Sequence, residues 1–244
     1  MIAAVHVTGT LINAGTVLVG TAIGTALGDR LPDRIRRTVM DGLGLFVLAV
    51  GLDEALAAFR PPLSTFTRAS VVIVLLSVLV GGVLGELARI DDGLNRAGER
   101  LKRRFGRGQS RFTEGFVVAS LVFCVGPLTI LGSIDDGLRG DYRLLAIKAA
   151  LDGFAALAFS SALGWGVGFS IITILLYQGS LSLAASAVAD GFSPEMIGAL
   201  TAAGGVLILG IGLRLLELRE IRVANLLPAL IIAPATVAIM QAVR

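Results

Sequence analysis

Residues 69–90 read ASVVIVLLSVLVGGVLGELARI, and this stretch decides the class of fold. Its two charged side chains, Glu86 and Arg89, both lie near its end. A helix needs about 20 consecutive, mostly apolar residues to cross the hydrocarbon core of a bilayer. We therefore interpret residues 69–90 as a membrane-spanning helix.

The whole chain has the composition of a membrane protein. Of its 244 residues, 55% are hydrophobic and 16% are charged, and the mean hydropathy is +0.85. Soluble domains carry about 25% charged residues. A soluble core of this size could not hide so many long apolar runs. The sequence therefore predicts an all-α, polytopic transmembrane helical bundle, with residues 1–244 forming one membrane domain.

About eight spans are expected, within a range of seven to nine. The uncertainty comes from Gly164-Trp165-Gly166, which leaves only a tight turn between the fifth and sixth. Ser193 followed by Pro194 predicts an N-cap and the first turn of the seventh. The expected spans are 7–28, 38–58, 69–90, 112–134, 144–163, 165–187, 195–216 and 222–243.

The segment 91–111 is too polar to span and is predicted to form a basic amphipathic helix at the membrane surface. Counting Lys and Arg on alternate sides of the spans gives 15 on one side and 6 on the other. The positive-inside rule makes the first side cytoplasmic. Segment 91–111 is then a cytoplasmic loop, and both termini are expected outside. The net charge of +3 comes from basic residues that lie between the hydrophobic spans, as is usual in membrane proteins. We therefore expect a lipid bilayer as the partner and no nucleic acid.

Two internal similarities suggest a repeat. Residues 44–52 (GLFVLAVGL) match residues 205–213 (GVLILGIGL) and run in the opposite direction in the expected topology. Inverted repeats are common in secondary transporters, although Gly/Leu-rich helices also resemble one another by composition. The second similarity, IDDGL at 90–94 and 134–138, is either chance or a shared helix end with a C-capping glycine.

The fourth span contains a helix breaker. Gly126-Pro127 lies in mid-span, where proline removes a backbone donor. Such breaks persist in membranes where they line a cavity or are covered by protein. We expect a discontinuous fourth helix that binds a solute or ion; a packing kink is the alternative. Three hydroxyls accompany the break: Ser120, Thr129 and Ser133.

An acid and a base share one face of the fifth span. Lys148 and Asp152 are separated by one helical turn, and Asp152 lies too deep to reach the membrane surface. A charge there costs about 2.5–3.5 kcal/mol on insertion scales and marks a candidate functional site. Asp152 is predicted to bind a proton or a cation such as Na⁺, with Lys148 as partner or competitor. The alternative is a structural ion pair.

Polar residues on other spans are weaker candidates. Unpaired amides in lipid are costly, so we expect them to point inward. They either bind a solute or form hydrogen bonds between helices. These side chains are Asn13, Gln178 and Asn225, with Ser180 beside the second of them.

A ridge of small residues runs along the first span. Such ridges allow close helix packing, either within the subunit or between the subunits of a homo-oligomer. The ridge consists of Thr16, Gly20, Gly24 and Gly28.

Several blocks resemble domain-of-unknown-function family 554, the YqgA-like bacterial membrane proteins. They are SLVFCVGPLTILGSIDDGLRGD (120–141), KAALDG (148–153), YQGSLSLAA (177–185) and NLLPAL (225–230). The resemblance implies a multi-pass protein of the bacterial cytoplasmic membrane and brings no assigned chemistry. The family pattern falls on Asn13, Ser120, Gly126, Pro127, Gly132, Ser133, Asp136, Gly137, Lys148, Asp152, Gln178, Gly179, Asn225 and Pro228.

Our leading hypothesis is a secondary transporter or permease for a small polar solute or ion, working by alternating access. An ion channel and a non-transporting assembly or regulatory protein are the alternatives. The sequence lacks GxxxxGK[ST], HExxH and GxSxG motifs, and it holds one Cys and one His. We therefore expect no enzymatic activity, no metal and no cofactor.

Overall fold

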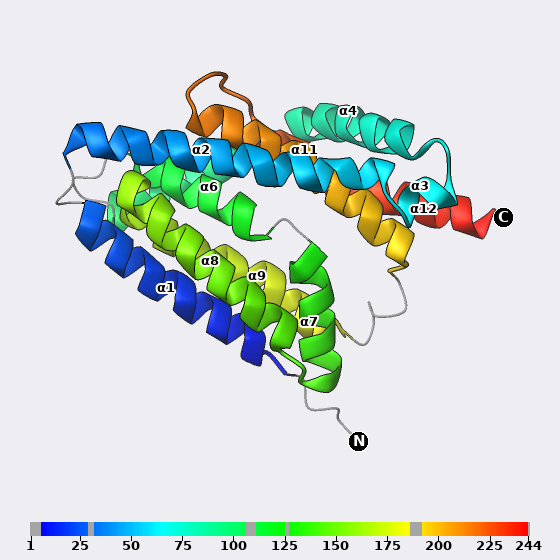
Figure 1. The fold of residues 1–244 in the computed structure, drawn as a ribbon, viewed down its shortest axis with the longest axis horizontal. Helices are drawn as coiled ribbons and strands as arrows, with labels where there is room; N and C mark the ends of the chain where they lie inside the picture. Colours follow the sequence, from blue (N-terminus) through cyan, green and yellow to red (C-terminus); the bar gives the residue numbers. More distant parts are fainter. Residues whose placement is uncertain (1–5, 29–31, 106–110, 125–126, 186–191, 244) are drawn as a thin grey trace. The chain divides into compact units, whose positions relative to one another are not determined.

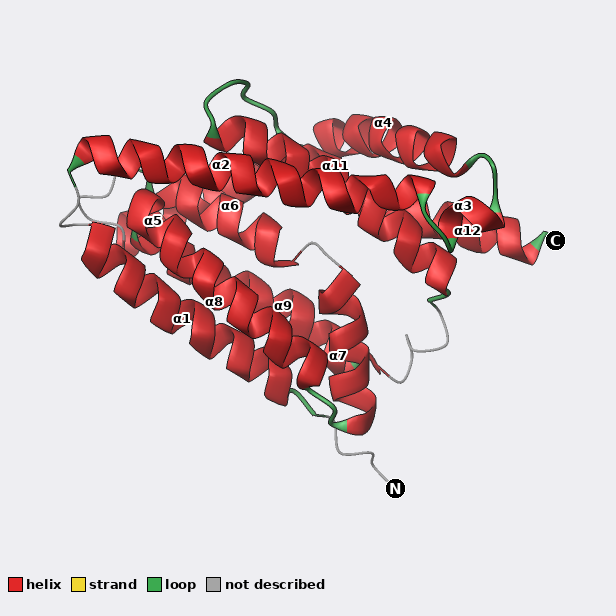
Figure 2. Cartoon of the chain, viewed as in Figure 1, coloured by secondary structure: helices red, strands yellow, loops and turns green. Residues whose placement is uncertain are grey.

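The structure is a computed structural model that describes residues 6–28, 32–105, 111–124, 127–185 and 192–243. These residues form helices joined by short loops, without a strand in the described ranges (Figure 2). The α-helices are α1 Thr8–Gly28, α2 Asp33–Ala55, α3 Leu63–Phe66, α4 Ser70–Ala88, α5 Ile90–Phe105, α6 Phe112–Cys124, α7 Pro127–Arg139, α8 Arg143–Leu163, α9 Ser170–Leu183, α11 Pro194–Leu215 and α12 Ala229–Ala242. The 3₁₀ helices are η1 Leu56–Phe59, η2 Trp165–Phe169 and η4 Val223–Leu226.

The expected membrane architecture is confirmed. Within the described residues, seven helical segments are long and apolar enough to cross a bilayer, and the count reaches eight if α6 and α7 form one crossing. These two helices are bent by 65°, since α6 ends at Cys124 and α7 begins at Pro127. The helix expected as the fourth span is therefore interrupted, as the sequence predicts. Gly126 lies outside the described residues.

The chain divides into two compact units, which we describe separately. Unit 1 comprises residues 1–40 and 95–191, and unit 2 comprises residues 41–94 and 192–244. Helices α2 and α5 each contribute residues to both units. The expectation of one membrane domain over 1–244 stays a prediction.

In unit 1, the small-residue ridge packs α1 against α8, and the two helices run side by side in Figure 1. A Cβ atom at any of three ridge glycines would overlap a backbone oxygen of α8. Successive glycines meet successive turns of α8, so the helices are parallel. This ridge is thus used within the unit. The contacts pair Gly20 with Gly153, Gly24 with Leu157, and Gly28 with Ser161.

Helix α9 packs against α1 in the opposite direction. Near the start of α1, the Thr10 hydroxyl accepts a hydrogen bond from Gln178 in the second half of α9. Near the end of α1, Thr21 lies against Gly168, just before α9 begins. These directions agree with an odd-numbered first crossing and an even-numbered sixth crossing.

Unit 2 contains the two similar segments, and they lie against each other on α2 and α11. A Cβ at Gly51 would lie 2.7 Å from the nitrogen of Leu209, and one at Gly212 would lie 2.7 Å from Cγ of Leu48. Gly51 corresponds to Gly212 in the alignment, and Leu48 corresponds to Leu209. The contact of Gly51 with Leu209 is therefore equivalent to the contact of Gly212 with Leu48. Antiparallel helices with exchangeable contacts are the arrangement that an inverted repeat requires.

The core of unit 2 is built from small side chains. Alanines from α11 and α12 pack with valine and isoleucine from α4, which lets the helix backbones approach closely. Without a hydrophobic driving force in lipid, this close packing holds the helices together. The buried cluster comprises Ala58, Leu63, Ile73, Val74, Ala199, Ala202, Ala203, Ala229, Ala233 and Val237.

The expected start of the seventh span is confirmed in atomic detail. Ser193 precedes α11 in an extended conformation, and its Oγ accepts a hydrogen bond of 3.2 Å from the nitrogen of Met196. Pro194 occupies the first helical turn, where no backbone donor is needed.

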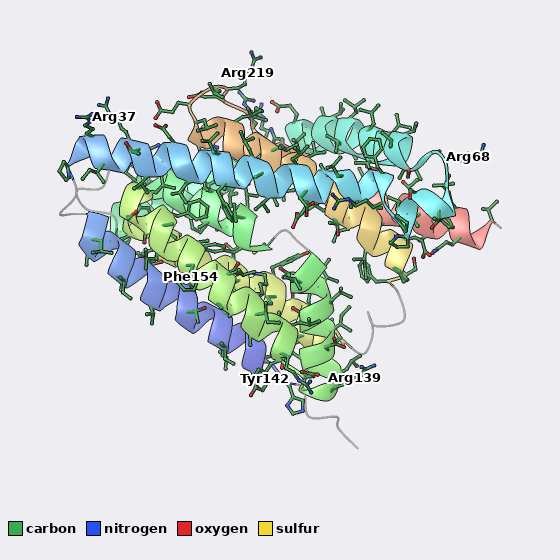
Figure 3. The ribbon with its side chains drawn as sticks, viewed as in Figure 1. Arg37, Arg68, Arg139, Tyr142, Phe154 and Arg219 are labelled. Atoms are coloured by element: carbon green, nitrogen blue, oxygen red, sulfur yellow. The ribbon has the colours of Figure 1, made fainter. Side chains whose placement is uncertain are left out.

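The expectation that both IDDGL copies end helices was wrong. The first copy opens α5, because its two aspartates suit the positive end of a helix, and α4 ends at Ala88, with Arg89 as its C-cap at φ 52°. The second copy does lie at the end of α7, which ends at Arg139, but the glycine after the helix is Gly140, with φ 68°, and not Gly137. Arg139 and Tyr142 flank this turn (Figure 3).

Candidate functional site

A network of polar side chains lies within unit 1, between α1, α8, α9 and the end of α6. Four of the residues expected from the sequence meet there. Each is less than one-tenth exposed, in a unit whose other buried side chains are largely apolar. The four are Asn13, Lys148, Asp152 and Gln178.

Lys148 joins the broken helix to α8. Its Nζ atom donates one hydrogen bond to the carboxylate of Asp152 and another, 2.8 Å long, to the carbonyl oxygen of Phe123. The first contact follows from the one-turn spacing on α8. The second exists because α6 stops at Cys124 and leaves its last carbonyls without helical partners. The ammonium is therefore held at the negative end of a half-helix.

Asn13 connects α1 to the same carboxylate. Its Nδ2 atom donates hydrogen bonds of 3.0 Å to Oδ2 of Asp152 and to Oε1 of Gln178. Gln178 in turn donates from Nε2 to the hydroxyl of Thr10 at 3.3 Å. Because both neighbours of Nδ2 accept, the orientation of the Asn13 amide is fixed by its partners. Its Oδ1 atom faces away and has no partner in the described structure.

One face of α7 carries a second group of buried oxygens. Thr129, Ser133 and Asp136 are fully buried at positions that share a helix face. Oδ2 of Asp136 accepts a hydrogen bond of 2.9 Å from the nitrogen of Gly9, which lies in the first turn of α1. Oδ1 of Asp136 and both hydroxyls have no hydrogen-bond partner among the residues described.

The remaining expected residues have local partners. The hydroxyl of Ser120 on α6 lies 2.9 Å from that of Thr173 on α9, so it links two helices of the bundle. Ser180 is exposed and donates to the carbonyl of Tyr177, so the network does not include it. Pro127 starts α7, as its fixed φ favours.

Asn225 belongs to unit 2 and is hydrogen-bonded there. Its Oδ1 accepts from the nitrogen of Asp91 at 2.7 Å, and its Nδ2 donates to Glu86 at 2.5 Å. Arg222 completes the cluster with an ion pair of 2.6 Å to Glu86. The amide thus ties the end of α4 and the first turn of α5 to η4, and the expectation that it joins the residues of the broken helix gains no support.

Four participants had no sequence signal that we used. The Phe123 carbonyl and the Gly9 amide are backbone groups exposed by helix ends, and Thr10 and Thr173 matter only through their neighbours. Thr10 precedes Asn13 by three residues on one helix face, and this spacing could have indicated it. The described residues contain no group of three His, Cys, Asp or Glu side chains that could hold a metal ion.

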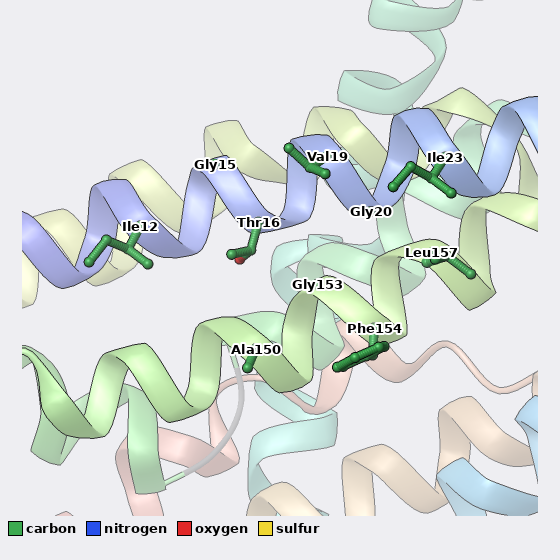
Figure 4. Close-up of a pocket in the computed structure, with 10 residues that line it drawn as sticks. All are labelled: Ile12, Gly15, Thr16, Val19, Gly20, Ile23, Ala150, Gly153, Phe154 and Leu157. Atoms are coloured by element: carbon green, nitrogen blue, oxygen red, sulfur yellow. The ribbon is translucent and has the colours of Figure 1, made fainter.

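A groove of about 470 Å³ follows the seam between α1 and α8 (Figure 4). Ile12, Val19 and Ile23 line one wall, and Phe154 and Leu157 line the other. Its single polar side chain, Thr16, is already bonded to the carbonyls of Asn13 and Ala149. This apolar lining suits a hydrocarbon neighbour, so we place the candidate site in the buried network instead.

The fold and these buried groups define a polytopic α-helical membrane protein with a polar network inside one of its units. Comparison with known proteins then shows the family. The model for "Protein of unknown function (DUF554)" matches residues 8–238, and the chain belongs to this family, as the resemblance implied.

Two relatives cover nearly the whole chain. "Uncharacterized membrane protein YdfK" of Bacillus subtilis (strain 168) is 29% identical over 234 residues, covering 96% of this chain and 97% of the relative. "Uncharacterized protein YqgA" of Escherichia coli (strain K12) is 32% identical over 232 residues, covering 93% and 94%. No solved structure matches the chain.

Proposed function

We propose that this protein is a secondary transporter of a small polar solute or ion, with its transport site at the polar network of unit 1. The observation that carries the proposal is the position of Lys148 between Asp152 and the Phe123 carbonyl of the broken helix. Transporters commonly place substrate and coupling-ion sites at discontinuous helices, whose free backbone ends face the ligand.

The network supplies a way to link ligand binding to helix movement. Asp152 accepts hydrogen bonds from both Lys148 and Asn13. A proton or cation that neutralises this carboxylate weakens its hold on the ammonium, since the attraction of opposite charges is strong away from water. Lys148 also holds the end of α6, so the occupancy of Asp152 biases the position of the broken helix. Such differential binding is what alternating access needs.

A buried ion pair alone does not distinguish a transport site from a structural contact. Its net effect on stability is small or unfavourable, because removing the charges from water can cost more free energy than their attraction returns. The surrounding amides and the interrupted helix are the features that favour a transport site over a structural ion pair. In this proposal the basic side with segment 91–111 is cytoplasmic, the termini are outside, and the bacterial inner membrane is the location. The protein has no enzymatic role in this mechanism.

The test is flux into proteoliposomes with a panel of small polar solutes, with and without an imposed pH or sodium gradient. We expect saturable, gradient-dependent flux that Asp152→Asn and Lys148→Met reduce at least tenfold, on the order of 1.4 kcal/mol or more in the transport barrier. Ser180→Ala is the matched control, because this hydroxyl bonds only within its own helix. Absence of gradient-dependent flux across the panel, or full flux in Asp152→Asn, contradicts the proposal.

The same reconstituted protein separates the alternatives. A channel gives unitary currents that do not saturate with solute concentration. A non-transporting regulator gives no flux, and reversing the charges of α5 abolishes its effect while Asp152→Asn is silent.

A further inference from the structure

Buried hydroxyls on α7 and α9 lack hydrogen-bond partners among the described residues, as does that of Thr21 on α1. Hydroxyls in helices normally satisfy themselves by donating to a carbonyl three or four residues earlier. Ser77 does so to Ile73 at 2.7 Å, and Thr201 does so to Ile197 at 2.8 Å. Ser133 on α7 and Ser182 on α9 have helical carbonyls at the same spacing, yet neither hydroxyl has a partner among the described residues.

Ser133 and Ser182 belong to helix segments that meet close to Asp136. Gly9 on α1 donates to Asp136, and a Cβ at Gly137 would overlap the carbonyl oxygen of Ser182 on α9. The first turn of α1 and the end of α9 therefore both contact the end of α7. Ser133 lies one turn earlier on the same face of α7.

Asp136 has no cation beside it in the described ranges of unit 1. The side chain is fully buried, forms no ion pair that the structure records, and keeps one oxygen without a partner. The amide of Gly9 and the positive end of α1 offset part of the charge. A buried carboxylate otherwise needs a counter-charge or a bound proton, because transferring the bare charge out of water is expensive.

We propose that Asp136, Ser133 and Ser182 bind a monovalent cation of the size of Na⁺. Oxygen atoms from carboxylates, hydroxyls and carbonyls are the ligands that hard cations prefer. One carboxylate balances one positive charge, whereas a divalent ion would leave a net buried charge. This inference rests on the proposed function, in which the ion is the coupling ion of the transporter.

The unpaired oxygens continue inward from this site. Thr129 lies one turn further along α7, and Oδ1 of Asn13 lies one turn beyond Gly9 on α1; both lack hydrogen-bond partners in the part of the chain described. Asn13 also bonds Asp152. Helix α1 therefore contacts both groups, Asp136 through Gly9 and the Lys148 pair through Asn13.

The experiment is cation binding to the purified full chain in detergent, in choline chloride at constant ionic strength. NaCl, LiCl and KCl are titrated while the unfolding temperature and the binding heat are measured. We expect saturable stabilisation by Na⁺ that is absent with choline. Asp136→Asn should remove it while keeping an acceptor for the Gly9 amide, and Ser133→Ala and Ser182→Ala should each weaken Na⁺ binding about tenfold.

The controls keep the outcomes distinct. Ser180→Ala should bind Na⁺ as the unmodified protein does, because this exposed hydroxyl lies outside the site. If Asp136→Asn does not fold, the two serine variants decide. The proposal is overturned by equal effects of Na⁺ and choline, by unchanged Na⁺ binding in the variants, or by a response to pH alone, which would identify a proton instead.

Flux measurements separate this site from the proposed function. Gradient-driven flux without Na⁺ binding overturns the cation site and leaves the transporter standing. Na⁺ binding without flux of any solute in the panel overturns the transporter and identifies a structural cation site.

Discussion

The ammonium of Lys148 reaches the backbone carbonyl of Phe123 across 2.8 Å, although 25 residues separate them in the chain. This contact fastens α8 to the interrupted end of α6 and places a positive charge where the helix leaves its carbonyls free. It is the relationship around which the polar network of unit 1 is organised.

Removing this charge should destabilise the protein strongly. We expect Lys148→Met to lower the free energy of unfolding by about 3–5 kcal/mol, because Asp152 stays buried without its partner. Adding Asp152→Asn should restore much of the loss. Thermal and chemical unfolding in detergent measure both effects. The control is Arg143→Met on the same helix, whose exposed pair with Asp141 should contribute at most about 1 kcal/mol; equal losses in the two single variants would contradict this account.

The seam between α1 and α8 predicts opposite effects for two glycines of one helix. Gly24→Ala should destabilise the protein by about 1–3 kcal/mol, since the added Cβ overlaps the backbone of Leu157. Gly15→Ala should be neutral or stabilise by up to about 1 kcal/mol, because nothing lies within 4 Å of the new atom. Unfolding midpoints of the two variants check the prediction, and a tolerated Gly24→Ala would exclude the close contact.

The exchangeable contacts of unit 2 predict paired effects. Gly51→Ala and Gly212→Ala should both destabilise by roughly 1–3 kcal/mol, with the larger loss at Gly51. The reason is that the new atom at Gly51 meets backbone, whereas the one at Gly212 first meets the flexible side chain of Leu48. Gly42→Ala, with open space around it, is the control for helix propensity. Loss of stability in only one of the pair would argue against a repeat.

Replacing the Asn225 amide with a carboxylate should create a repulsion between residue 225 and Glu86. Asn225→Asp keeps an acceptor for the amide of Asp91 but places a carboxylate against Glu86. We expect a loss of about 1–3 kcal/mol, of which Glu86→Gln should recover part. A double-mutant cycle by unfolding, together with limited proteolysis of α5, measures the coupling. Additive effects of the two substitutions would show that the side chains do not interact.

The sequence predicted the interactions between residues that are close in the chain. It did not predict those between residues that are distant in the chain. Lys148 and Asp152 could be paired because one turn of one helix joins them, and the Ser193 cap follows from three consecutive residues. The bond from Gly9 to Asp136 spans 127 positions, and no local pattern records it.

Ser180 lies outside the polar network for an equally physical reason. Ser180 was expected with Gln178 because it is near in sequence, but two residues along a helix turn about 200° around the axis. Its hydroxyl is therefore exposed and bonds to Tyr177, while Gln178 points inward. Proximity along the chain therefore does not place two side chains on the same face of a helix.

Because the glycines of α1 lie directly on the backbone of α8, neither helix can slide or rotate past the other without steric collision. We therefore expect α1 and α8 to move together as one rigid body. In the proposed transport cycle, the helices on either side of the 65° bend are the ones left to move. We therefore expect a cross-link between α1 and α8 to leave flux unchanged and one that fixes α7 to abolish it.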